Sequence, residues 1–412
     1  MEWEGIATMN TNPIDTLDLR KLGQELKRAR KQSGLTQEDA AELVHVARTT
    51  ITAIEKGERK IRADELVELA RAYGRQVSDF LRSRSTLESF QAVQFRGPTS
   101  QKEEHQEEIE ISVSRFEDLC SNYLELEQIT GIKSIRHYAT EYRRKGLNLE
   151  LEAEGLAQAE RNRLGLGDAP LLLIRDILEQ DVGIKIFYLP LQPGNLSGIY
   201  YYSEDLGGCI AVNSNHEEDR CRWTLCHDWC HFIADRYEPT VLIEDGYLRQ
   251  PASERFADLF AKYFLMPTST ITQRFNEIYS QQNAMTLRGL CILAHRFGVS
   301  VEALTRRLED LRLMKAGAWQ RLLDRGVKIR ETQKELGLQP VEGRRDVFPI
   351  QYREMAFVAY ETGKISEGQF ANFLQLNQIA SRQLVAQLYT QGMTQPGNEG
   401  DPNNDRESAF DE

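Results

Sequence analysis

The stretch "TLCHDWCHFIADR", residues 224–236, carries His227 and His231, two of the chain's seven histidines. The two are four residues apart, and residues i and i+4 lie on one face of an α-helix. A helix over this stretch would let both imidazoles bind one zinc ion, because imidazole is a common zinc ligand. Two histidines packed in the core of a buried helix are the alternative, so the pair alone does not establish a metal site.

A third ligand would have to come from a later element, because catalytic zinc usually has three protein ligands and an open position for water. The helical pattern "PASERFADLFAKYFLMP", residues 251–267, offers Glu254. Asp228 follows the first histidine where the zinc-peptidase motif H-E-x-x-H has a glutamate that takes a proton from water. Aspartate is one methylene shorter, and a displacement of about 1 Å costs on the order of a hundredfold in rate. From the residues alone, both a metal site and two core histidines stay open, and so does catalysis.

Three strand patterns precede this helix. They are "VGIKIFYLPL" (182–191), "SGIYYYSE" (197–204) and "GGCIAVNS" (207–214), with Gly207–Gly208 as the expected hairpin turn. Amphipathic helices are expected on both sides, and from residue 268 to about residue 390 the chain has a helical pattern. The sequence predicts a mainly α fold with a small β-sheet.

Together these motifs resemble the ImmA/IrrE family of metallopeptidase-like domains over about residues 150–320. The resemblance rests on Val212–Asn213, Arg222, Trp223, Thr224, Leu225, His227, His231, Glu254, Ala257, Asp258, Phe260, Ala261, Leu265, Met266 and Pro267. It implies a zincin-like α+β domain that binds Zn²⁺ through His227, His231 and Glu254, with Asp228 in the catalytic position.

Other potential ligands lie near this motif. Cys226 and Cys230 are also four apart. They could form a thiolate site or a redox switch, or they could act as small apolar packing residues, which the family has at these positions. The packing interpretation is preferred. His216 is expected in a solvated loop, and His295 in a helical packing element.

Residues 18–85 carry a net positive charge, unlike the rest of the chain. Residues 18–85 hold 15 lysines and arginines against 11 acidic residues, a net charge of +4, although the whole chain carries −12. Short helices end at Gly34, Gly57 and Gly74, a short fifth helix is expected to begin with "VSDFLR" at Val77, and Thr36 with Asp39 forms a weak capping box. The sequence thus predicts a five-helix N-terminal domain. A helix, a turn and a second helix at this spacing can place the second helix in the major groove of DNA.

"LTQEDAAELVHVARTTITAIEKGERKI", residues 35–61, resembles the Cro/C1-type (XRE) helix-turn-helix family, and the likeness covers residues 20–82. It implies that Arg30 and Glu55 form a buried ion pair. His45 stands where the turn usually has glycine, and Ala47 occupies the capping position without a capping side chain. The expected small core is Ala40, Leu43, Val46, Ile51 and Ile54. The expected DNA contacts are Gln37, Arg48, Thr49, Thr52, Ala53 and Lys56.

The 412 residues suffice for several domains, and 41% hydrophobic with 28% charged residues is ordinary for a globular protein. We expect a DNA-binding domain at 18–85, a linker and helical connector at 86–149, the metallopeptidase-like domain at 150–320, a helical segment at 321–394 and a disordered acidic tail at 395–412. The absence of a signal sequence or long apolar run and the unpatterned six cysteines favour a reduced, cytoplasmic protein without membrane contact.

The two motifs in one chain predict a sequence-specific transcriptional regulator that binds double-stranded DNA, by default as a homodimer. Its zinc domain would sense a signal or cleave a protein, such as a partner repressor. The alternatives are a non-catalytic regulator with a structural or ligand-sensing metal site, and an antitoxin-type DNA binder.

Overall fold

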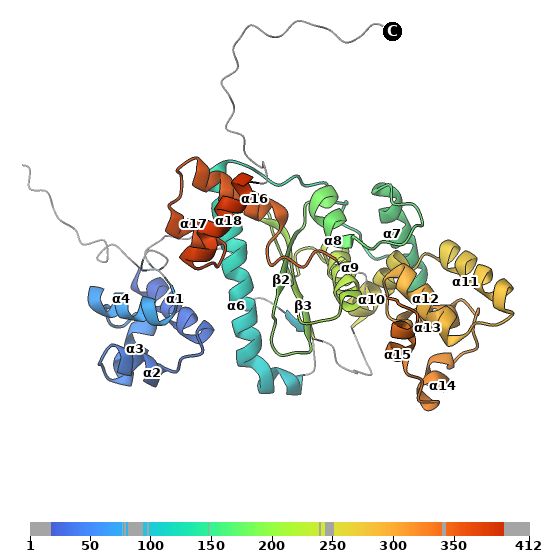
Figure 1. The fold of residues 1–412 in the computed structure, drawn as a ribbon. Helices are drawn as coiled ribbons and strands as arrows, with labels where there is room; N and C mark the ends of the chain where they lie inside the picture. The colour runs from blue at the N-terminus through green and yellow to red at the C-terminus, as the bar shows by residue number, and fades with distance from the viewer. Residues whose placement is uncertain are drawn as a thin grey trace, which may run out of the picture. The chain divides into compact units, whose positions relative to one another are not determined.

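A computed structural model describes residues 18–75, 77, 80, 94–96, 99–146, 148–238, 240–243, 251–339 and 343–390 (Figure 1). These residues form two compact units. The first extends to Glu125 and from Ser134 to Val347, and the second comprises Leu126–Lys133 and the residues from Phe348. The predicted tail 395–412, linker residues 86–93 and most of the helix expected after residue 77 lie outside the described residues. Within those residues, no helix combines the length and apolar character needed to cross a bilayer.

Within residues 18–75, the N-terminal domain forms the helices α1 (Leu19–Gln32), α2 (Gln37–Leu43), α3 (Arg48–Glu55) and α4 (Ala63–Ala72). Their apolar faces meet in a core of its own, which includes Leu22, Leu26, Ile51, Ile54, Leu66 and Leu69. Thr36 caps α2 by accepting the backbone N–H of Asp39, while the Asp39 carboxylate accepts the N–H of Thr36. The predicted capping box is therefore confirmed.

The turn between α2 and α3 shows two local departures from ideal chemistry. His45 has φ 53°, the left-handed conformation that glycine adopts more readily. Ala47 has the extended backbone of an N-cap but makes no side-chain capping bond. The expected core was wrong at Leu43, whose side chain is 46% exposed. Leu43 lies two residues after the buried Ala41, and two residues on a helix are turned about 200° apart.

A five-stranded sheet forms the centre of the remaining part of the first unit. Its strands are β1 (Gln94–Arg96), β2 (Lys185–Leu189), β3 (Leu196–Ser203), β4 (Gly207–Asn213) and β5 (Thr240–Ile243), in the order β1-β5-β3-β4-β2. β3 pairs antiparallel with β4 and β5, whereas β2 is parallel to β4 and β1 is parallel to β5. Strands β1 and β5 were not predicted from the sequence.

The hairpin between β3 and β4 corrects one expectation. Gly207 already pairs with Ser203, so the turn is residues 204–206 and the two glycines begin β4. Close packing explains the glycines better than a turn does. A Cβ at Gly207, where φ is 84°, would lie 2.3 Å from the Tyr138 hydroxyl, and one at Gly208 would lie 2.7 Å from Ile184 Cδ1.

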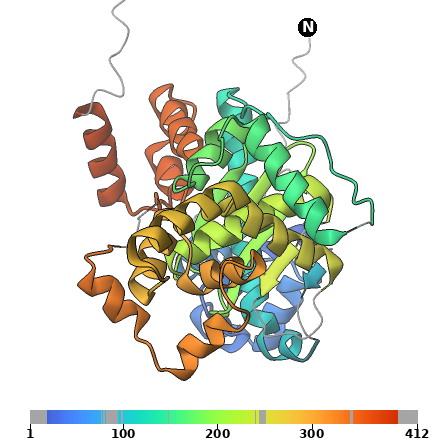
Figure 2. The ribbon, with the colours of Figure 1, turned by 90° about the vertical axis from the view of Figure 1, so that its right-hand side faces the viewer.

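Helices cover both faces of this sheet (Figure 1). On one face lies α6 (Thr99–Thr130), where the Phe116 ring meets Phe187 of β2 edge-on at 5.9 Å. On the other lies α9 (Glu218–Ala234), which packs on β3 and β4. α10 (Ala252–Leu265) packs on α9, and α7 (Leu149–Arg163) on α10. Figure 2 shows these helices in front of the sheet. Trp229 of α9 packs edge-on against Phe260 and Phe264 of α10, so the two helices share an apolar core.

The remaining elements complete the two units. In the first, α8 (Ile174–Asp176) and a π-helix (Ile177–Val182) precede β2, and α11 (Thr268–Gln282), α12 (Leu287–Phe297), α13 (Val301–Asp310), α14 (Ala318–Asp324) and α15 (Ile329–Glu335) follow α10. The second unit contains α16 (Ile350–Glu361), α17 (Glu367–Phe373) and α18 (Gln378–Thr390). The fold is therefore mainly α with one small sheet, as predicted.

Candidate metal centre and DNA-binding face

Helices α9 and α10 bring His227, His231 and Glu254 together. The two histidine Nε2 atoms lie 3.1 Å apart. The Glu254 carboxylate oxygens lie 3.2 Å from Nε2 of His227 and 3.3 Å from Nε2 of His231. Zinc bonds of about 2.0–2.1 Å at tetrahedral angles separate neighbouring ligand atoms by about 3.3 Å. The spacing therefore fits a metal ion of this kind, and the set has the two nitrogens and one oxygen that zinc accepts.

Each histidine has a second carboxylate on its other ring nitrogen. Nδ1 of His227 lies 2.9 Å from Asp258 Oδ1, and Nδ1 of His231 lies 3.2 Å from Asp235 Oδ2. When Nδ1–H donates to a carboxylate, the lone pair is left on Nε2, the atom that faces the Glu254 carboxylate. Burial would lower the pKa of His227, but its bonds to Asp258 and Glu254 outweigh burial and raise that pKa to about 10.

Asp228 lies in the same buried region but makes no comparable bond. Its side chain is fully buried, and both carboxylate oxygens lack a hydrogen-bond partner among the described residues. Burial raises the pKa of Asp228 to about 7, although His227 and His231 oppose the shift. A buried carboxylate without protein partners is costly, so its oxygens are suited to a metal, a water or a substrate proton.

The strand above α9 leaves room for this carboxylate. A Cβ on Gly198 of β3 would lie 2.5 Å from Asp228 Oδ2 and 2.7 Å from Thr224 Cγ2. The register of β3 against β5 is also irregular between Leu196 and Gly198. Only glycine therefore fits here without moving its neighbours. Nothing in the sequence pattern marked Gly198, because its role depends on how β3 lies over α9.

Several other residues near the motif do not join the metal group. Cys226 and Cys230 are fully buried, and burial raises the pKa of both thiols, which favours the inert thiol over the thiolate. His216 was expected to be solvated, but its side chain is buried and its ring bonds the carbonyl of Gly194 at 2.9 Å. His295 bonds the carbonyl of Gln339 at 2.7 Å.

The expected DNA-contacting residues gather on and beside α3. Arg48, Thr49, Thr52, Ala53 and Lys56 follow helical spacing along one face, on which Arg48, Thr49 and Lys56 are exposed. At the start of α2, Gln37 donates to Glu55 at 2.8 Å and accepts from Thr52 at 3.2 Å. The buried Glu55 also pairs with Arg30 at 2.6 Å, which confirms the expected ion pair. Gln37 is thereby tied to α3.

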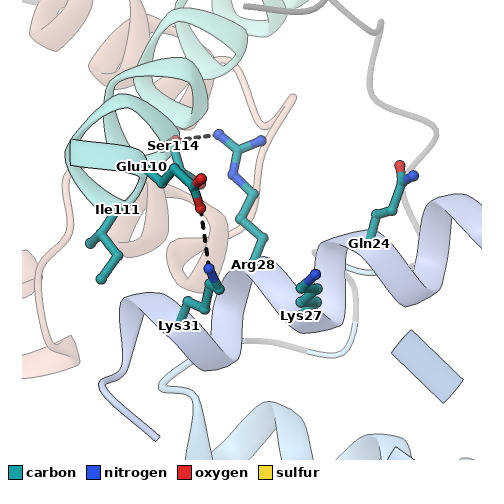
Figure 3. A pocket seen from close by; sticks show the side chains of 7 residues that line it. All are labelled: Gln24, Lys27, Arg28, Lys31, Glu110, Ile111 and Ser114. Atoms are coloured by element: carbon teal, nitrogen blue, oxygen red, sulfur yellow. Dashed lines mark hydrogen bonds and ion pairs between the residues drawn. The ribbon is translucent and has the colours of Figure 1, made fainter. Parts of the chain in front are cut away.

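An acidic stretch of α6 lies beside this face. Lys31 of α1 pairs with Glu110 at 3.2 Å, and Arg28 donates to the carbonyl of Ser114, as Figure 3 shows. Arg28 also pairs with Glu117 at 2.9 Å. A neighbouring groove of about 850 Å³ is lined by Gln37 and Arg48 on one side and by residues of α6 that include Glu107 and Glu108. The sequence predicted only a linker and helical connector here.

Two comparisons place these parts in known families. Residues 26–80 match the helix-turn-helix family, and residues 179–309 match the IrrE N-terminal-like domain of the M78 peptidases. The second match contains all three residues of the metal group. No curated protein matches the chain. The chain therefore joins a Cro/C1-type (XRE) helix-turn-helix domain to an ImmA/IrrE-type metallopeptidase-like domain.

Proposed function

We propose that this chain is a sequence-specific DNA-binding regulator whose second domain holds Zn²⁺ through His227, His231 and Glu254 and hydrolyses a peptide bond in a protein. The observation that carries the proposal is the buried His–His–Glu group beside an unpartnered carboxylate. Two histidines oriented by outer carboxylates and one glutamate form a ligand set that peptidases use for zinc.

The reaction would divide its tasks among the chain's own residues. A zinc ion in this group would supply Lewis acidity toward a carbonyl oxygen. Asp228 would take the proton of the attacking water on a carboxylate oxygen, which is unpartnered and hence available. Asp258 and Asp235 would keep the imidazoles oriented, and the apolar core around Trp229 would exclude bulk water.

One observation favours a second candidate, a metal site that senses or stabilises without cutting. The side chains of His227 and His231 are each 1% exposed and that of Glu254 is 7% exposed, so a protein substrate needs a movement to reach them. Asp228, which is one methylene shorter than the glutamate of the zinc-peptidase motif, also favours this second candidate. In this case metal or ligand binding would change DNA binding without any cleavage.

For the DNA-binding domain, we propose that Arg48, Thr49, Thr52 and Ala53 face bases and that Gln37 and Lys56 face phosphates. Arginine pairs with guanine edges in the major groove, and threonine bonds bases or touches the thymine methyl group. A homodimer on a two-fold operator is the geometry that such domains favour.

The test combines metal analysis with cleavage. The purified full chain should contain about one zinc per protomer and cleave a candidate repressor protein, and a chelator should abolish cleavage. Bound zinc without cleavage, unchanged by Asp228→Glu, contradicts the peptidase proposal and supports the sensing one. Cleavage that rises with Asp228→Glu supports a weakened peptidase.

A further inference from the structure

The two histidines differ in how their outer carboxylates are held. Asp258, the partner of His227, has a side chain that is 38% exposed, so water can solvate it. Asp235, the partner of His231, has a side chain that is only 5% exposed. A buried carboxylate without a counter-charge is costly, so Asp235 needs a cation more than Asp258 does.

Arg144 supplies that cation from a distant part of the chain. Its Nη2 lies 2.8 Å from Asp235 Oδ1, while Asp235 Oδ2 lies 3.2 Å from Nδ1 of His231. The three side chains thus form a relay in which each carboxylate oxygen has its own donor. Arg144 is 91 residues before Asp235 and belongs to the segment 131–146 that follows α6.

Further contacts fix this segment on both helices of the metal group. The backbone N–H of Tyr142 donates to the carbonyl of Ile233 on α9 at 2.8 Å. The Tyr142 ring stacks on Phe256 of α10 at 5.9 Å with an interplanar angle of 8°. The Arg144 guanidinium lies over the same Phe256 ring at 5.9 Å. Arg144 therefore reaches Asp235 from a backbone that is already anchored.

We propose that Arg144 is a positioning residue of the metal centre, which acts on His231 through Asp235. Arg144 holds the Asp235 carboxylate so that it accepts Nδ1–H of His231, and Nε2 then faces the metal. The inference rests on the proposed metal site. It adds a residue outside α9 and α10 whose loss weakens metal binding although no ligand is removed.

Reciprocity gives the proposal a second consequence. If Arg144 strengthens metal binding, then bound metal must stabilise the contact of Arg144 with Asp235 by the same free energy. Zinc should therefore slow hydrogen exchange at the amide of Tyr142, which bonds the last turn of α9. Zinc bound at His231 also stabilises α9 directly, so the part of this slowing that Arg144→Gln removes is the part that depends on Arg144.

The test measures zinc affinity of the full chain by competition with a chromophoric chelator, with Zn²⁺ alone as the probe. Arg144→Ala should weaken zinc binding by up to about 10-fold, less than the 10–100-fold cost of losing a carboxylate bonded directly to a ligand, because Arg144 acts through Asp235 and its side chain is 32% exposed. Arg143→Ala, at the exposed neighbouring position, is the matched control and should leave the affinity unchanged. Arg144→Lys should recover part of the loss because it restores the charge without the planar fork.

The outcomes separate the two proposals. A wild-type chain that binds no zinc contradicts the proposed metal site itself. A wild-type chain that binds zinc, with Arg144→Ala within twofold of it, overturns the role of Arg144 alone. Should Arg144→Ala fail to fold, the zinc affinity of Arg144→Gln and the zinc-dependent slowing of exchange at Tyr142, compared between Arg144→Gln and the wild-type chain, still decide. Equal slowing by zinc in the two chains contradicts the role of Arg144.

Discussion

The proposed DNA-binding face and the candidate metal centre are built in opposite ways. On the DNA-binding face, Arg48, Thr49 and Lys56 are exposed and come from one short helix and its end. In the metal centre, His231, Asp235, Glu254 and Arg144 come from three separate segments, and the ligands are buried. A surface site tolerates local change at other positions, whereas a buried site depends on each partner that satisfies its charges. The two should therefore respond differently to substitution.

The largest expected effect is the loss of one ligand. Glu254→Ala removes one of three ligands and should weaken zinc binding by more than about 100-fold, because even an outer partner is worth 10–100-fold. DNA binding should persist, since the helix-turn-helix domain has its own core. Metal analysis and anisotropy on a DNA duplex measure the two effects. Unchanged zinc content would show that Glu254 is not a ligand, and lost DNA binding would show that the two regions are coupled.

The second effect concerns base reading. Arg48→Ala should weaken binding to an operator, obtained by selection from random duplexes, by about 1–3 kcal/mol. Zinc content should not change, which sharpens the contrast between the regions. Binding to unselected DNA serves as the control. Equal weakening on both kinds of DNA would place Arg48 on the phosphate backbone instead of on a base.

The third effect tests the close approach of β3 to Asp228. Gly198→Ala places a Cβ 2.5 Å from Asp228 Oδ2, so the free energy of unfolding should fall by about 1–3 kcal/mol. Gly194→Ala is the matched control, because a Cβ there meets nothing within 4 Å. Urea denaturation measures both variants. Equal stability of the two variants would show that β3 can move away from α9.

The fourth effect is a gain at the helix-turn-helix. Ala47 has N-cap backbone geometry but no capping oxygen, so Ala47→Ser should stabilise this domain by about 1 kcal/mol. Ala47→Val changes the side chain without adding an oxygen and should give no such gain. Thermal unfolding, followed for the domain by hydrogen exchange in α3, measures the difference. No gain from serine would mean that the N–H groups of α3 are already satisfied.

The smallest effect concerns the acidic stretch of α6. Glu107 and Glu108 share a groove with Gln37 and Arg48, and carboxylates there repel DNA phosphates. The double variant Glu107→Gln, Glu108→Gln should therefore bind DNA a few-fold more tightly at low salt, since exposed charges contribute up to about 1 kcal/mol. The double variant Glu331→Gln, Glu335→Gln, at exposed positions on α15, removes the same two charges and is the control. A gain equal to that of the control would reflect net charge alone.

Features that depend on local sequence could be predicted, whereas features that depend on tertiary packing could not. The capping box of Thr36 and Asp39 depends on a spacing of three residues at the start of one helix. The ion pair of Arg30 with Glu55, which are 25 residues apart, and the glycine-like position of His45 are implied by the family resemblance instead. The pair His227 and His231 depends on helical spacing, so its common face was predictable. Local sequence carries such features because a turn or two of helix fixes their geometry.

The parts that depend on tertiary packing were not predictable from spacing. Arg144 reaches Asp235 across 91 residues, and Gly198 matters only because β3 lies against α9. The hairpin turn was misplaced because glycines that allow close packing look the same in sequence as glycines that allow a turn. Strands β1 and β5, with three and four residues, are too short for an alternating pattern to identify.

The six cysteines can report when the part of the chain that surrounds them unfolds. All six are buried thiols, and they lie between residues 120 and 291, so none belongs to the helix-turn-helix domain or to helices α16–α18. An alkylating reagent can modify such a thiol only after local or global unfolding exposes it. The rate of alkylation, resolved by mass spectrometry at each cysteine, therefore measures the opening of the part that contains the candidate metal centre, separately from the helix-turn-helix domain.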